Sequence, residues 1–231
     1  MQHLILLHGA LGSKDQLQPL VAALENDFQM HTFNFSGHGG RSFADTAFSI
    51  PLFAEQIAQY MHEMGIAQAY IFGYSMGGYA AIYLAKHHPE KVNKLITLAT
   101  KFHWDEKTAA REVRLLDGKT IQEKVPAFAA QLQQRHSPND WLTLLHKTSE
   151  LLIGLGKQNA LQLEDYTTIT TPCLLLLGDR DKMVTLDETI AVYKQLPNAQ
   201  FGVIPGTPHA LEQVNVALLV QLIKGFINEK A

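Results

Sequence analysis

Short runs of apolar residues recur along the chain and are separated by longer segments. The apolar runs cover residues 4–7, 30–35, 69–72, 94–99, 172–177 and 201–204. Several are unbroken rather than alternating, which is typical of strands covered on both faces. The segments 15–25, 50–64, 77–87, 186–195 and 211–228 show helical spacing instead. Because strands that alternate with helices pair in parallel through right-handed crossovers, this pattern predicts an α/β fold with a mostly parallel six-stranded sheet and helices on both faces.

Residues 101–170 break this alternation, because they contain helix-like pieces and no convincing strand. The pieces cover 105–116 and 120–135, and a third is expected after Ser137-Pro138, with Ser137 as N-cap and Pro138 as the first helical residue. We therefore predict an α/β core formed by residues 1–100 and 171–231, with a helical cap, or lid, inserted over 101–170.

Composition and charge narrow the class of protein. Of the 231 residues, 46% are hydrophobic and 18% are charged, which is enough apolar material for a globular core. The formal charge of −3 and the lack of a basic cluster argue against a nucleic-acid partner. The single cysteine, Cys173, suits a reducing compartment, and no signal peptide or membrane-spanning run is visible. The expectation is a cytoplasmic protein with no membrane span, no metal and no cofactor.

The sharpest motif is Gly73-Tyr74-Ser75-Met76-Gly77-Gly78, between a predicted strand and a predicted helix. This is the pattern of a nucleophile elbow, in which a tight turn exposes the serine hydroxyl. The alternative is an ordinary glycine-rich turn, but the strand before it and the helix after it favour the elbow. Ser75 would then lie at a helix N-terminus, where backbone N–H groups stabilise an oxyanion.

A serine nucleophile needs a general base, and the base needs an acid to orient it. Asp179 and Asp181 follow the run 172–177, and His209 follows the run 201–204. Because open α/β sheets place their sites at the carboxyl ends of the strands, we expect Ser75, Asp181 and His209 to converge. Asp179 competes for the role of the acid; Asp181 is preferred because it lies further into the loop. The histidines His3, His87, His88 and His136 are interpreted as surface residues.

Two backbone N–H groups should form an oxyanion hole. The candidates are Met76, directly after the nucleophile, and Ala10, in the loop His8-Gly9-Ala10-Leu11-Gly12. His8 is interpreted as a residue that orients this loop rather than as a catalytic one. Gly37-His38-Gly39-Gly40 lacks the spacing of a phosphate loop and is assigned to a turn beside the site.

Together these motifs resemble the α/β-hydrolase superfamily, over nearly the whole chain. The resemblance rests on His8-Gly9, the segment 35–42, the elbow around Ser75, Gly178-Asp179-Arg180-Asp181 and Pro208-His209. It implies the nucleophile Ser75, the acid Asp181, the base His209, an oxyanion hole at Ala10 and Met76, and the lid. The chain departs from the family by starting at what would be the third strand of eight.

The resemblance is greatest to small lidded bacterial esterases and to the pyruvate-eliminating synthase of the menaquinone pathway. That synthase carries an arginine where this chain has Tyr79. We therefore expect a serine hydrolase that cleaves a small to medium carboxylic ester, with a small-molecule acyl substrate. The lyase, a thioesterase and a hydrolase-fold binding protein remain alternatives. Leu11, Tyr79, Trp104 and Trp141 are the candidates for the substrate pocket.

Overall fold

The computed structural model describes residues 1–229, so the last two residues of the predicted core segment lie outside the described part. Within that part the strands form one six-stranded sheet in the order β2-β1-β3-β4-β5-β6, and every neighbouring pair is parallel. The strands are β1 (His3–Leu7), β2 (Gln29–Thr32), β3 (Ala69–Tyr74), β4 (Val92–Leu98), β5 (Cys173–Gly178) and β6 (Ala199–Ile204). The fold class predicted from the sequence is therefore confirmed.

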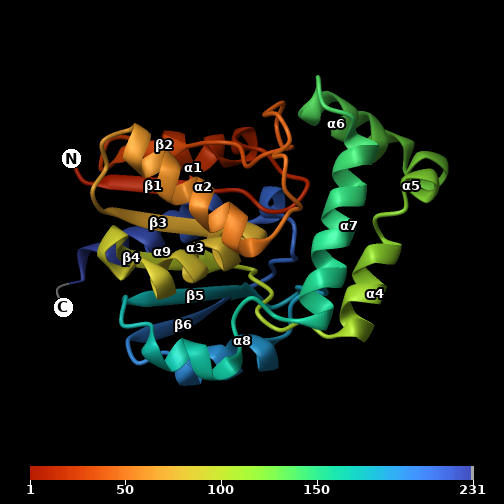
Figure 1. Ribbon diagram of the computed structural model, residues 1–231. Helices are drawn as coiled ribbons and strands as arrows, with labels where there is room; N and C mark the ends of the chain where they lie inside the picture. Colours follow the sequence, from red (N-terminus) through yellow and green to blue (C-terminus); the bar gives the residue numbers. More distant parts are fainter. Residues whose placement is uncertain (230–231) are drawn as a thin grey trace.

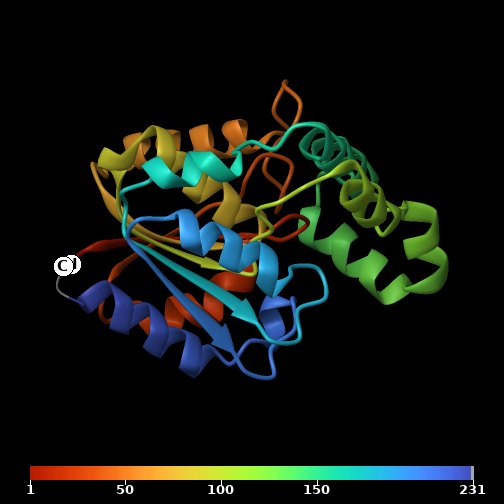
Figure 2. The same cartoon turned by 90° about the horizontal axis from the view of Figure 1, so that it is seen from below.

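Helices cover both faces of this sheet (Figures 1 and 2). One face carries α1 (Gln18–Leu24) and α9 (Val216–Asn228), and the other carries α2 (Ile50–Glu63), α3 (Met76–His87) and α8 (Leu186–Gln195). Alternate strand residues supply the two cores: Ile5 and Leu7 pack on the side of α2 and α3, while Leu4 and Leu6 pack on the side of α1 and α9. None of the helices described is both long and apolar enough to span a membrane.

Between β4 and β5 the chain leaves the sheet and forms a helical insertion, the name used here for residues 101–170. It contains α4 (Glu106–Arg114), α5 (Gly118–Lys124), α6 (Pro126–His136) and α7 (Trp141–Lys157), followed by the 3₁₀ helix η3 (Leu163–Thr168). Figure 1 shows α4 to α7 at the end of the sheet toward which the strand arrows point. The insertion therefore lies at the edge where an α/β sheet places its site.

Several predicted boundaries are wrong. Ser137 is the C-cap of α6, and the next helix begins at Trp141, where the Asp140 carboxylate accepts hydrogen bonds from the N–H groups of Leu142 and Thr143. A carboxylate cap at Asp140 thus prevailed over the Ser-Pro signal. The piece expected over 120–135 is two helices, because Pro126 has no N–H to continue a helix but fits the first turn of a new one.

The segments expected as helices over 15–25 and 211–228 each begin with a 3₁₀ turn, η1 (Lys14–Leu17) and η4 (Leu211–Gln213). The strand expected over residues 30–35 is shorter than predicted: β2 ends at Thr32. Phe33 and Phe35 lie beyond it and pack in the core without extending the ladder.

Candidate active site

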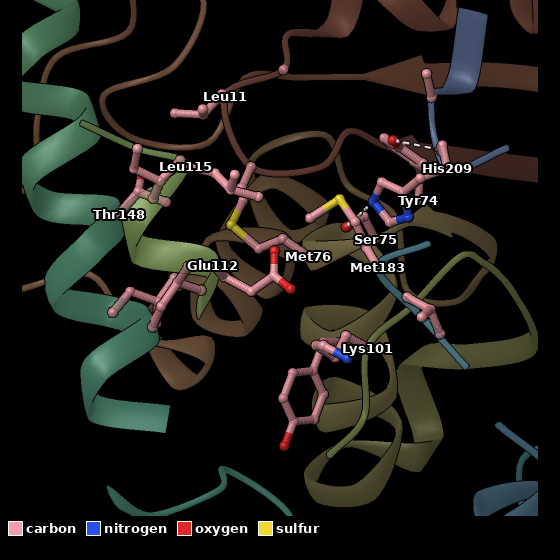
Figure 3. Close-up of a pocket in the computed structure, with 18 of the residues that line it drawn as sticks. Leu11, Tyr74, Ser75, Met76, Lys101, Glu112, Leu115, Thr148, Met183 and His209 are labelled. Atoms are coloured by element: carbon pink, nitrogen blue, oxygen red, sulfur yellow. Dashed lines mark hydrogen bonds between the residues drawn. The ribbon is translucent and has the colours of Figure 1, made fainter. Parts of the chain in front are cut away.

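The structure brings the three predicted side chains together at the carboxyl edge of the sheet. Ser75 follows β3, Asp181 follows β5 and His209 follows β6. His209 Nε2 lies 3.4 Å from Ser75 Oγ, and His209 Nδ1 lies 2.7 Å from Asp181 Oδ2. Because a carboxylate only accepts, Nδ1 carries the proton and Nε2 faces the serine with its lone pair. Figure 3 shows Ser75 and His209 side by side on the cavity wall.

The backbone at Ser75 is that of a sharp strand-to-helix turn. Ser75 has φ 51° and ψ −118°, in a region that residues with a side chain rarely adopt. Neighbouring backbone leaves no room beside the turn: a Cβ on Gly73 would lie 2.5 Å from Gly78 Cα. The glycine thus lets the first turn of α3 close against β3, which presents the serine side chain at the helix N-terminus.

The two competing aspartates have different partners. The Asp181 side chain is fully buried, and its Oδ1 accepts hydrogen bonds from the N–H groups of Met183 and Val184 at 2.8 and 2.9 Å. Burial opposes ionisation, but the hydrogen bond and charge of His209, together with the N–H groups of Val184 and Met183, outweigh it and hold the pKa of Asp181 below its usual value. Asp179 is exposed, and its carboxylate accepts from Thr207 N at 3.0 Å. Geometry therefore favours Asp181 as the partner of His209.

The proposed oxyanion donors lie on either side of Ser75. Met76 is the first residue of α3, so its N–H has no acceptor in a preceding helical turn. Ala10 lies in the loop after β1 and, like Met76, lines the cavity. His8 is fully buried beneath this loop: its Nδ1 donates to Gly9 O at 2.8 Å and its Nε2 accepts from Phe35 N at 3.2 Å. Burial lowers the pKa of His8 to about 4, so it is a neutral residue that orients the loop.

The helical insertion holds the same loop from the other side. Leu11 has φ 56°, an unusual value for a leucine, and its carbonyl accepts from Arg135 Nη1 at 2.9 Å and from His136 Nε2 at 3.0 Å. His136 Nδ1 in turn accepts from Gly39 N at 3.1 Å. The interpretation of His136 as a surface residue is wrong, because its side chain is completely buried between the insertion and the core. Burial lowers its pKa to about 4.

A cavity of about 920 Å³ opens over Ser75, between the sheet edge and the insertion. Leu11, Tyr79 and Trp104, three of the four predicted pocket residues, lie on its wall. Trp141 does not: it is 5% exposed and packs against Ile121, Leu132 and Leu145 in the small core of the insertion itself. The assignment of Trp141 to the pocket is therefore corrected. The Trp141 side chain faces the other helices of the insertion.

Sequence reasoning missed several polar residues on the cavity wall, namely Lys101, Glu112, Arg135 and Thr148. Glu112 shares the buried face of α4 with Ala109, three residues earlier. That spacing could have drawn attention to it. The neighbouring Arg111 donates to Glu112 Oε1 from Nε and Nη2. Over residues 1–229, histidine, cysteine, aspartate and glutamate side chains form no group of three or more that could hold a metal ion.

Comparison with known proteins agrees with this geometry. A family model described as the alpha/beta hydrolase fold matches residues 2–211. The chain belongs to the α/β-hydrolase family. This α/β-hydrolase is 26% identical over 245 residues to the pimeloyl-(acyl-carrier protein) methyl ester esterase of Aeromonas hydrophila, covering 97% of this chain and 94% of the relative. It is 29% identical over 227 residues to the Vibrio vulnificus protein of the same name, covering 90% and 87%.

Solved structures of other hydrolases have the same fold. The 2-hydroxy-6-oxo-6-phenylhexa-2,4-dienoate hydrolase of Rhodococcus superposes on this α/β-hydrolase with a TM-score of 0.83 at 18% identity, covering 99% of this chain and 91% of that one. At this identity the likeness shows the fold alone. The family and the names of the sequence relatives together support a hydrolase.

Proposed function

We propose that this protein is a serine hydrolase that cleaves a small to medium carboxylic ester through an acyl-enzyme on Ser75. The observation that carries the proposal is the chain of contacts from Ser75 Oγ to His209 Nε2, at 3.4 Å, and from His209 Nδ1 to Asp181, at 2.7 Å. The first distance is longer than a strong hydrogen bond, as is common at sites without substrate. Esterase relatives support the same reaction class.

In the first step Ser75 Oγ attacks the ester carbonyl carbon and its proton passes to His209 Nε2. The negative charge that develops on the carbonyl oxygen is stabilised by the N–H groups of Ala10 and Met76. The tetrahedral intermediate then collapses: the bond to the alcohol oxygen breaks, and His209 gives its proton to that oxygen. An alcohol leaves and the acyl group stays on Ser75.

In the second step a water molecule takes the place of the alcohol. His209 accepts a proton from the water as its oxygen attacks the acyl carbon, and the proton returns to Ser75 Oγ as the carboxylic acid leaves. Asp181 stabilises the positive imidazole in both steps and fixes its orientation. The fully buried Asp181 carboxylate suits this role, because neighbouring N–H groups hold it in place.

The helical insertion would act as the lid of the acyl pocket. It covers the cavity with apolar side chains, Trp104, Leu151 and Leu155 among them, while Leu11 and Tyr79 contribute from the core. Tyr79 is held by the hydrogen bond that its hydroxyl accepts from Leu161 N, and burial raises its pKa to about 12. The tyrosine is therefore a neutral wall residue.

The proposal is tested with p-nitrophenyl esters, acyl-coenzyme A thioesters and the menaquinone-pathway intermediate, each assayed with the wild type and with Ser75→Ala. We expect the esters to be the best substrates and Ser75→Ala to lower turnover by roughly a thousandfold or more, as for other members of such triads. Ser42→Ala, at an exposed serine, is the control. Undiminished ester turnover in Ser75→Ala would refute the nucleophile. Faster pyruvate release from the intermediate, or faster thioester cleavage, would refute the ester substrate.

A further inference from the structure

The cavity wall opposite Ser75 carries buried polar atoms that the described residues leave without a hydrogen-bond partner. These atoms are Glu112 Oε2 and Thr148 Oγ1, on α4 and α7 of the insertion. Glu112 is 4% exposed and Thr148 is 3% exposed, and both line the cavity. A buried polar atom without a partner costs free energy, so both atoms are free to bind a group that arrives with the substrate.

The chemistry of these atoms restricts that group. Glu112 Oε2 only accepts hydrogen bonds, so its partner must be a donor. Thr148 Oγ1 can donate or accept. The indole Nε1 of Trp104, on the same wall, is also buried and has no partner among the described residues. A group that both donates and accepts hydrogen bonds fits this set.

Charge argues that the group is neutral. Arg111 donates twice to Glu112 Oε1, at 3.1 and 2.8 Å, and so compensates its negative charge. Lys101, whose Nζ lies 5.7 Å from the centre of the Trp104 ring, pairs with Glu188 Oε2 at 3.0 Å. Arg135, a third cation on the wall, donates to Leu11 O at 2.9 Å and lies 3.8 Å from Glu212 Oε1. Since each of these cations has a carboxylate partner, the described cavity wall offers neither an unpaired cation for a carboxylate nor an unpaired anion for an ammonium group.

The position of the polar atoms assigns the group to the acyl part of the ester. His209, which protonates the leaving alcohol, lies on one side of Ser75 in Figure 3, whereas Glu112, Leu115 and Thr148 lie on the other. The figure also shows the Glu112 carboxylate extending from its helix into the cavity toward Met76. The leaving group must face His209, so the acyl chain extends toward Glu112 and Thr148.

We propose that Glu112 and Thr148 form a subsite for a hydroxyl group on the acyl chain, so that the natural substrate is the ester of a hydroxylated carboxylic acid. The hydroxyl would donate to Glu112 Oε2 and accept from Thr148 Oγ1. An unsubstituted chain leaves both atoms unpaired, and sites built to bind a hydroxyl discriminate strongly against analogues without one. This inference rests on the proposed acyl transfer on Ser75.

The test compares p-nitrophenyl esters with a common leaving group and three acyl ends: hexanoate, 6-hydroxyhexanoate and the 5-carboxypentanoate. The same three acyl ends on an eight-carbon chain test a longer distance from Ser75 to the subsite. At the better length we expect the hydroxyl to raise kcat/KM about tenfold over the methyl end, which corresponds to about 1.4 kcal/mol, close to the lower end of the range for a hydrogen bond to a charged group. The carboxylate should be the poorest substrate, because it meets the Glu112 oxygen.

Variants of Thr148 and Glu112 test whether these residues cause the preference for the hydroxyl end. Thr148→Val keeps nearly the same side-chain shape and should reduce the ratio of kcat/KM for the hydroxyl end to kcat/KM for the methyl end toward one. Glu112→Gln should reduce this ratio as well. Ser149→Ala is the matched control: it removes a hydroxyl from the next position of the same helix, one that already donates to Leu145 O at 2.9 Å, and the ratio should stay as in the wild type. Thermal melting shows whether each variant is folded.

Three results would overturn the subsite: equal rates for hydroxyl and methyl ends at both lengths, a preference for the carboxylate, or a hydroxyl preference that survives in both Thr148→Val and Glu112→Gln. Equal rates would mean that water or the insertion itself satisfies the polar atoms. Failure of the proposed function is a separate result. If the wild type cleaves no ester, calorimetry of methyl 6-hydroxyhexanoate against methyl hexanoate still reports the subsite, with tighter binding of the first expected and equal binding refuting it.

Discussion

The residues around Ser75 and the cavity wall of the helical insertion differ in whether their buried polar atoms have hydrogen-bond partners. The polar side chains nearest Ser75 bind one another and the backbone: Asp181 accepts from His209 and from two backbone N–H groups, and both nitrogens of His8 have partners. Elsewhere in the core, His38 Nε2 and Glu188 Oε1 are buried without a partner in the described part of the chain. On the wall of the insertion, Glu112 and Thr148 keep atoms without partners among residues 1–229. The core is organised before substrate arrives, as electrostatic stabilisation of a transition state requires. The proposed subsite uses the unpaired atoms of the insertion to bind the substrate.

From this difference we expect the rate of the reaction and the choice of substrate to depend on different residues. Changes at the sheet edge should act on turnover of every ester, because they disturb groups that the proposed mechanism places at the reacting atoms. Changes on the wall of the insertion should act on the choice among esters. Arg135 and His136 are the exception, since these insertion residues bind Leu11 O in the loop that contains Ala10, the proposed oxyanion donor.

The largest expected effect concerns the acid of the core. Asp181→Asn keeps the shape of the side chain but favours the wrong tautomer of His209, so kcat should fall by up to roughly ten-thousandfold. Asp179→Asn removes only the charge that accepts from Thr207 N, so mainly the melting temperature should fall. Steady-state kinetics and thermal melting of the two variants decide between them. If Asp179→Asn alone abolishes activity in a folded protein, the acid is misassigned.

A smaller effect is expected where the insertion binds the core. His136→Ala removes the donor to Leu11 O and the acceptor for Gly39 N, so Ala10 N–H should lose its alignment. Since one oxyanion donor is worth about a hundredfold or more in kcat, a misaligned one should cost about tenfold to a hundredfold, with little change in KM.

Two further variants test this linkage. His136→Gln, whose amide both donates and accepts, should restore part of kcat, whereas His146→Ala, at an exposed position of α7, should have no effect. A His136→Ala protein with normal kcat and only a lower melting temperature would restrict the residue to a structural role.

The smallest effects come from the same substitution in the two regions. Gly154 lies exposed in α7 with nothing within 4 Å of a built Cβ, so Gly154→Ala should stabilise the protein by about 0.5–1 kcal/mol through helix propensity. Gly73→Ala would place a Cβ 2.5 Å from Gly78 Cα. It should lower the free energy of unfolding of the protein by about 1–3 kcal/mol or more. Urea unfolding measures both. Equal effects of the two substitutions would contradict the tight closure of the elbow.

Sequence patterns predicted the core well because its constraints are local. Unbroken apolar runs marked the buried strands, and the glycines around Ser75 marked a turn that other residues would block. Parallel pairing then followed from the alternation of strands and helices, and parallel strands bring their carboxyl ends to one edge. The placement of Ser75, Asp181 and His209 at that edge needed no further information.

The insertion was harder to predict because packing between its helices decides which side chains reach the cavity. Trp104 and Trp141 are both aromatic residues of one helical segment, yet the first lines the cavity and the second packs against Leu132 and Leu145. His136 is buried only because α6 docks on the loop that contains Leu11. The hydrogen bond from His136 to Leu11 joins residues 125 positions apart, and no local periodicity reports it.

The most direct test of the central claim, that Ser75 is a nucleophile activated by His209, is covalent labelling with a fluorophosphonate followed by peptide mass spectrometry. The account predicts one adduct, on the peptide that contains Ser75, formed quickly by the wild type, much more slowly by His209→Ala and not at all by Ser75→Ala. A folded wild type that forms no adduct, or that carries it on another residue, would contradict the claim.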